Sequence, residues 1–247
     1  MKLVKLGWKL ARAVLHAVSG FWTIRSRFHK LPVAQHGPLV QAWARQMLAI
    51  TGIDLVVRGQ PPAKGPVLLV ANHISWLDIL VIHAAGHCRF VSKSDVKRWP
   101  FVRTLAMGAG TLFIERDSRR DALRVVHHMV EGLQAGDVLA VFPEGTTGDG
   151  LTLKPFHANL LQAAITANAP VQPMALRFID RATGRISLAP RYVDDDSLVG
   201  SIWQTLMARN LCAEVSFGTP ELAQGRDRRS WAGDLQREVE RLRDGMG

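Results

Sequence analysis

The chain of 247 residues has few cysteines and no long uncharged segment. Its two cysteines, Cys88 and Cys212, are too few for a disulfide framework, which fits a reducing compartment. No stretch of about twenty residues is free of charge, so the sequence predicts no clear membrane-spanning helix. The basic, apolar N-terminus lacks a small-residue cleavage site at a suitable place, and we do not interpret it as a signal peptide.

Several motifs that mark common kinds of site are also missing. The sequence contains no Gly-x-Ser-x-Gly elbow, no P-loop and no dinucleotide-binding fingerprint. His83, His87 and Cys88 have a partly ligand-like spacing, but no further cluster of Cys or His follows nearby, which argues against a zinc site. We therefore expect no metal and no redox cofactor.

Acidic residues are scarce relative to basic ones, at 21 against 31, and the net charge is +10. A basic balance of this size indicates a polyanionic partner, either a nucleic acid or an anionic membrane surface. The sequence has no basic patch interleaved with aromatic residues and no nucleic-acid-binding motif. A basic nucleic-acid- or membrane-binding protein without catalytic activity remains a distant alternative, and we expect no nucleic-acid partner.

The segment 2–24 has the pattern of a basic amphipathic helix. Its polar residues recur at steps of three and four along one helix face, namely Lys2, Lys5, Lys9, Arg12 and His16. Apolar residues cover much of the rest and include Trp8 and Trp22. This pattern is typical of a helix that lies in a membrane surface, although a terminal helix packed on the core would have a similar one.

The remaining pattern predicts an α/β fold with a mostly parallel central sheet flanked by helices. Expected strands are 53–58, 66–71, 89–92, 110–114, 137–142, 171–178, 186–192 and 212–217. Expected helices are 38–50, 76–85, 99–107, 118–134, 156–168, 198–209 and 230–243. Two N-terminal helices within residues 1–52 would form a membrane-associated motif ahead of a domain at 53–247.

His73 and Asp78 lie between an apolar strand and the helix that follows it. Ligands of open α/β sheets bind beyond the carboxyl ends of the strands, where His73 is expected. Asp78, in the first helical turn, can fold back onto the imidazole and leave its other nitrogen free to take a proton from a hydroxyl. Ser75 and Asp78 also fit a capping box, which only stabilises a helix start. The spacing leaves both interpretations open.

Three further segments follow predicted strands. Arg116 ends the segment that begins at Gly110, and a guanidinium there can bind a phosphate, although a surface ion pair is the simpler interpretation. The turn Glu144–Gly145–Thr146–Thr147 combines a glycine with hydroxyls and backbone amides that could hold an anion. Lys93 is one of three cations that follow another strand.

Four segments in this order resemble the four sequence blocks of the glycerolipid acyltransferase family, which includes the 1-acylglycerol-3-phosphate acyltransferases. They are His73–Asp78, Gly110–Arg116, Phe142–Thr146 and Ala169–Pro173. The resemblance covers roughly residues 53–218, and its four ordered blocks make a chance match improbable.

The resemblance implies an O-acyltransferase on the cytoplasmic face of the bacterial inner membrane. Its donor would be acyl-CoA or acyl carrier protein, and its acceptor a lysolipid, first of all 1-acyl-sn-glycerol-3-phosphate, giving phosphatidic acid. His73 would be the general base, oriented by Asp78. The substrate-binding residues would be Lys93, Gly110, Arg116, Glu144, Gly145, Thr146 and Thr147. Arg116 would hold the phosphate of the acceptor, and Glu144 and Gly145 would position the acceptor.

The third block departs from the pattern of the phosphatidate-forming members. Those members usually continue Gly-Thr-Arg-Ser, whereas this chain continues Gly145-Thr146-Thr147-Gly148 and so lacks one phosphate-binding arginine. Lys93, Lys97 and Lys154 could compensate for the missing charge. A different lysolipid acceptor, such as lyso-ornithine lipid, is the alternative that this departure raises.

Overall fold

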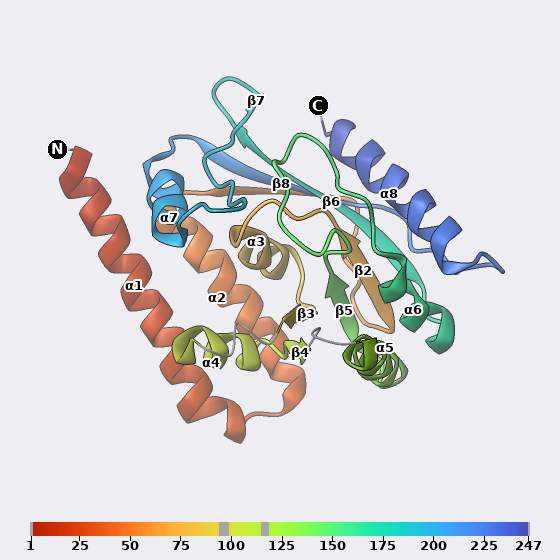
Figure 1. Ribbon diagram of the computed structural model, residues 1–247. Helices are drawn as coiled ribbons and strands as arrows, with labels where there is room; N and C mark the ends of the chain where they lie inside the picture. Colours follow the sequence, from red (N-terminus) through yellow and green to blue (C-terminus); the bar gives the residue numbers. More distant parts are fainter. Residues whose placement is uncertain (1, 94–98, 115–118, 247) are drawn as a thin grey trace.

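The computed structural model describes residues 2–93, 99–114 and 119–246 as a three-layer fold with a central sheet between two layers of helices (Figure 1). The strand order is β1-β8-β6-β2-β5-β3-β4, and β7 pairs with β6. The strand bounds are β1 Asp54–Arg58, β2 Val67–Ala71, β3 Arg89–Lys93, β4 Leu112–Ile114, β5 Val138–Val141, β6 Val171–Asp180, β7 Arg185–Ile186 and β8 Leu211–Phe217.

Five neighbouring strands, from β6 to β4, run parallel to one another. β8 is antiparallel to β6, and β1 is parallel to β8. β2 is buried along its whole length, as its unbroken apolar sequence predicts for a strand covered on both faces. The carboxyl ends of β2, β5, β3 and β4 therefore meet at one edge of the sheet, which places the chain segments that follow them close together.

The helices divide between the two faces of the sheet (Figure 1). The helix bounds are α1 Lys2–Arg27, α2 His36–Thr51, α3 Leu77–Ala85, α4 Pro100–Gly108, α5 Arg119–Gln134, α6 Leu161–Ala167, α7 Leu198–Met207 and α8 Arg228–Asp244. α2 and α3 share one apolar core with the sheet. α5, α6 and α8 share the other core, where Trp231 of α8 is fully buried. α1 lies outside the first layer, against α2, α4 and α7.

The predicted fold class is confirmed, and several predicted strands differ in extent, two of them for an identifiable reason. The segment expected as a strand at 186–192 pairs with the sheet only at β7 and then leaves it. Pro190 has no N–H to donate to a ladder, and the segment bonds instead to the loop after β2. The strand expected from Gly110 begins at Leu112, because Gly110 ends the preceding turn with a φ of +77°.

Two polar residues of α1, Lys9 and His16, face the protein together with the buried Leu6, while several of its large apolar residues face outward. Lys9 Nζ donates to the carbonyl of Thr51 at the end of α2, and a ring nitrogen of His16 lies 2.9 Å from the carbonyl oxygen of Trp43. Trp8, Leu15 and Trp22 are 67%, 68% and 60% exposed. Among the described residues, no helix is both long enough and apolar enough to cross a membrane.

Candidate active site

The loop after β2 is fixed by side chains at both of its ends. Asn72 is buried and forms two hydrogen bonds with the backbone of Leu176 in β6, one from its amide nitrogen and one to its amide oxygen. These bonds extend the pairing of β2 with β6 by one residue beyond the last strand residue, Ala71. His73 is therefore held immediately beyond the carboxyl end of a central strand.

Asp78 organises the rest of this loop. Its Oδ2 lies 2.8 Å from His73 Nδ1 and also accepts hydrogen bonds from the backbone N–H groups of Ile74 and Ser75. The carboxylate is fully buried, and among the described residues its Oδ1 has no hydrogen-bond partner. The bond from Ser75 is one of the two bonds of a capping box. The same oxygen thus stabilises the start of α3 and bonds to the imidazole, so the geometry is compatible with both interpretations of the spacing.

One face of the His73 imidazole lies against the ring of Phe142. The two rings are stacked, with centroids 3.9 Å apart and planes only 6° apart. In the parallel ladder Val70 pairs with Val141, so the residues that follow β2 and β5 leave the sheet side by side. Phe142 and Asp78 together fix the ring, and no described residue forms a hydrogen bond with Nε2. A base held in this way can receive a proton from a substrate hydroxyl.

Glu144 joins three parts of the site. Its Oε1 accepts a hydrogen bond of 2.7 Å from the backbone N–H of His73, and its Oε2 accepts one of 2.8 Å from the backbone N–H of Lys154. The residue is only 4% exposed. Burial raises the pKa of Glu144, and the two hydrogen bonds oppose this shift. In this arrangement the carboxylate supports the backbone on either side of it.

The turn after Glu144 lies against the loop that carries His73. Gly145 has a φ of +74°, and a Cβ placed there would come within 3.1 Å of the His157 ring. The Gly148 N–H donates to the carbonyl of His73 over 2.7 Å. Thr146 is exposed, while the carbonyl of Thr147 accepts a hydrogen bond from Lys154 Nζ. The ammonium group of Lys154 therefore lies beside Thr147, the position at which this chain lacks the arginine.

Of the remaining candidates, Gly110 is not brought to His73. Gly110 precedes β4, and parallel strands place it toward the opposite edge of the sheet from His73. Its carbonyl accepts a 2.9 Å hydrogen bond from Arg89 Nε. Lys93 is the last residue of β3, but its side chain lies outside the described part of the structure, as do Lys97 and Arg116.

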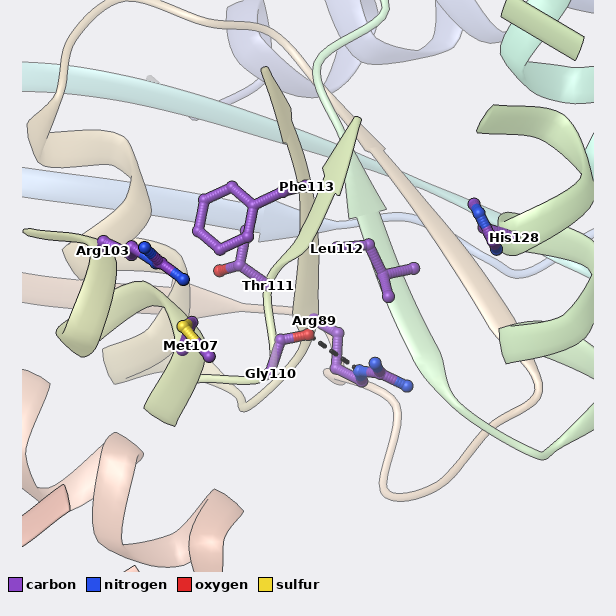
Figure 2. Close-up of a pocket in the computed structure, with 8 residues that line it drawn as sticks. All are labelled: Arg89, Arg103, Met107, Gly110, Thr111, Leu112, Phe113 and His128. Carbon is purple, nitrogen blue, oxygen red and sulfur yellow. Dashed lines mark hydrogen bonds between the residues drawn. The ribbon is translucent and has the colours of Figure 1, made fainter. Parts of the chain in front are cut away.

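A pocket of about 500 Å³ opens beside the edge strand β4 (Figure 2). Its described lining residues are Arg89, Arg103, Met107, Gly110, Thr111, Leu112, Phe113 and His128. α4 contributes Arg103 and Met107, and α5 contributes His128 (Figure 2). His73, Asp78 and Glu144 are absent from this described lining, so the pocket is separate from the residues with the geometry for proton transfer.

The acyltransferase family model matches residues 51–177 of this chain. The chain belongs to the acyltransferase family. It is 40% identical over 175 residues to a 1-acyl-sn-glycerol-3-phosphate acyltransferase of Neisseria meningitidis, a match covering 70% of this chain and 68% of the relative. It is 35% identical over 214 residues to a lyso-ornithine lipid O-acyltransferase of Pseudomonas aeruginosa, covering 85% and 81%. These matches confirm the family that the four sequence blocks predicted.

A solved structure supports the same fold. The crystal structure of the 1-acyl-sn-glycerophosphate acyltransferase PlsC from Thermotoga maritima matches with a TM-score of 0.63. The match covers 95% of this chain and 97% of that one, at 18% sequence identity. At this identity the match establishes the α/β architecture of the acyltransferase.

The sequence pattern assigned no role to two residues of the site. Phe142 was expected at the end of a strand and at the start of the third family block, without a contact to His73, and Asn72 had no expected role. The signal for Phe142 was the pairing of the strands, because a residue that ends one parallel strand lies beside the end of its neighbour. That pairing depends on the strand order, which local sequence patterns do not contain.

Proposed function

We propose that this acyltransferase transfers an acyl chain from a thioester donor to the free hydroxyl of a lysolipid. The observation that carries the proposal is the imidazole of His73, which is fixed by Asp78 and Phe142 and has an Nε2 without a described protein partner. The relatives at 35–40% identity carry the names of lysolipid acyltransferases. A general base beside a sheet edge is the group that such a transfer requires.

The proposed reaction needs one proton carrier and no acyl-enzyme. His73 Nε2 takes the proton from the acceptor hydroxyl as its oxygen attacks the thioester carbonyl carbon. Asp78 stabilises the imidazolium through Nδ1–H. The tetrahedral intermediate then collapses, the carbon–sulfur bond breaks, and the thiol leaves with the proton from His73. The products are the acylated lipid and the free thiol of the donor, which is acyl-CoA or acyl carrier protein in this proposal.

The first acceptor that we propose is 1-acyl-sn-glycerol-3-phosphate, in line with the Neisseria relatives. Thr147 favours a second candidate, lyso-ornithine lipid, because this position lacks the arginine usual in the phosphatidate-forming members. The relative named for lyso-ornithine lipid also aligns over the longer stretch. The two acceptors share a hydroxyl for His73 and differ in their head groups.

We further propose that the enzyme acts at the cytoplasmic face of the bacterial inner membrane, in contact with it through α1. The exposed Trp8, Leu15 and Trp22 form an apolar face on this helix, and indole rings favour the interface between lipid and water. Lysolipid acceptors reside in that interface, so the contact would bring the site to its substrate.

An acceptor screen tests the proposed activity. The purified enzyme is incubated with acyl-CoA or acyl carrier protein, and with lysophosphatidate, lyso-ornithine lipid or no acceptor, and both acylated lipid and free fatty acid are measured. We expect acylated lipid from at least one acceptor and a loss of about a hundredfold or more in His73→Ala. His29→Ala, which removes an exposed imidazole outside the proposed site, is the control. Near-normal turnover by His73→Ala, or free fatty acid as the sole product, would contradict the proposal.

A further inference from the structure

The segment Pro190–Tyr192 is fastened to the catalytic loop. Ser75 Oγ, in the loop between His73 and Asp78, donates a hydrogen bond to the carbonyl of Pro190. The N–H of Tyr192 donates to the carbonyl of Ile74 over 3.2 Å. The backbone of Arg191 is therefore held between two hydrogen bonds to residues adjacent to the catalytic histidine.

A second element holds the same segment from the other side. Ser201 Oγ on α7 lies 3.1 Å from the carbonyl oxygen of Arg191 and 3.3 Å from that of Pro190. Ser75 and Ser201 are both buried. The backbone around Arg191 is thus held by hydrogen bonds from both Ser75 and Ser201, although the Arg191 side chain is exposed.

The positive charge of Arg191 lies near the turn that follows Glu144. Asp149 in that turn accepts hydrogen bonds from the N–H groups of Thr152 and Leu151, which lower its pKa, and the nearby positive charge of Arg191 lowers it further. Gly150 of the same turn lies against the side chain of Ile74. Arg191 is therefore close to the meeting point of this turn and the catalytic loop.

Arg191 differs from several other arginines of the chain in having no bound carboxylate. Arg177 pairs with Glu214, Arg181 with Asp54, and Arg226 with Asp234. Within the described residues, the guanidinium of Arg191 forms neither an ion pair nor a hydrogen bond. Its donors are free to bind an anion from outside the protein, and a guanidinium can hold the oxygens of a phosphate or carboxylate in pairs.

We propose that Arg191 binds the anionic group of the lysolipid head group and so supplies a charge that Thr147 does not. The inference rests on the proposed function, because it assigns a residue to the acceptor of that reaction. The ligand is an oxyanion, either the phosphate of lysophosphatidate or the carboxylate of an ornithine head group. In both cases Arg191 orients the acceptor from beside the loop that carries His73.

The test compares Arg191→Ala and Arg191→Lys with Arg185→Ala. Arg185 lies on β7, in the same connection between β6 and α7, and removing it changes the net charge equally. Steady-state kinetics are measured in neutral detergent micelles with both acceptors and with the donor that the wild type uses. Because one charge-assisted contact is lost, we expect Arg191→Ala to raise the acceptor KM about tenfold to a hundredfold. The value of kcat and the donor KM should change little, and Arg191→Lys should fall between.

The two acceptors identify the oxyanion. A larger KM effect with lysophosphatidate assigns the phosphate, and a larger effect with lyso-ornithine lipid assigns the carboxylate. An unchanged acceptor KM, equal effects of Arg191→Ala and Arg185→Ala, or a rise confined to the donor KM would overturn the inference. Those results leave the lysolipid acyltransferase proposal intact, whereas a wild type that acylates neither lysolipid refutes the proposed function itself.

Discussion

Glu144 Oε1 accepts a hydrogen bond of 2.7 Å from the backbone N–H of His73, across 71 positions of the sequence. Its other carboxylate oxygen, Oε2, accepts a hydrogen bond of 2.8 Å from the backbone N–H of Lys154. Glu144, which is expected to position the acceptor, thus also positions His73, the proposed base. Its substitution should affect the chemical step and not only the binding of substrate.

Glu144→Gln tests this relationship. The glutamine oxygen can accept one of the two N–H groups, but its NH₂ faces the other donor, so one buried N–H loses its partner. We expect kcat to fall about tenfold with little change in the acceptor KM. Gln236→Glu provides a comparison outside the turn. It also exchanges a carboxamide and a carboxylate, at a residue whose Oε1 accepts a hydrogen bond from the backbone N–H of Phe156. A large rise in acceptor KM at constant kcat would instead indicate direct contact with the lipid.

Asp78→Asn and Asp78→Ala separate orientation from charge. Because Asp78 Oδ1 has no partner among the described residues, an asparagine can place its NH₂ there and keep its oxygen toward His73. We expect Asp78→Asn to stay folded and to lose roughly tenfold in kcat, since a neutral hydrogen bond replaces a charge-assisted one. Asp78→Ala removes the acceptor of three hydrogen bonds and should also lower the melting temperature. Equal melting temperatures for both variants would argue against this role of the carboxylate.

The apolar face of α1 can be tested by flotation with vesicles that contain anionic lipid. We expect the triple change of Trp8, Leu15 and Trp22 to serine to weaken vesicle binding at least tenfold, because each buried side chain contributes up to about 1.5–3 kcal/mol. The control replaces three exposed leucines away from α1, Leu123, Leu151 and Leu222, with serine. Equal binding by the two triple variants would show that α1 is not the main contact.

His83 should make the protein sensitive to acid. Burial, followed by the charge of His87, lowers its pKa from 6.5 to about 3. The unfolded chain therefore binds a proton that the folded chain does not, and stability falls as the pH drops from about 6.5 toward 3, by about 1.4 kcal/mol per pH unit. Denaturant unfolding between pH 7.5 and 5 should show a shallower pH dependence for His83→Leu than for the exposed control His29→Leu. Parallel slopes for the two variants would refute this role of His83.

The sequence predicted the parts of the fold that depend on local patterns. β2 and α3 were recognisable because an unbroken apolar run and a helical pattern lie on either side of His73. The inward position of Lys9 and His16 on α1 was not predictable, because hydropathy identifies two faces but not which one meets the protein. Lys9 and His16 face inward since the carbonyls of α2 accept their hydrogen bonds.

The site was predictable to the extent that its partners are close in the chain. His73 and Asp78 are five positions apart, and one helical turn brings them together. The contact of Phe142 with His73 depends on the strand order, which places β5 beside β2. The contact of Pro190 with Ser75 depends on a segment that leaves the sheet after β7. A two-residue strand in place of the expected 186–192 is the visible sign of that departure.

The bond between Ser75 and Pro190 has a consequence for synthesis of the chain. A nascent chain that has emerged as far as Lys154 already contains His73, Asp78 and Glu144, but not the carbonyl that the Ser75 hydroxyl requires. The loop from His73 to Asp78 can form all of its hydrogen bonds only after Pro190 has left the ribosome. Premature termination before that point should therefore release fragments that contain His73 and Asp78 but lack the hydrogen bond that holds the loop between them.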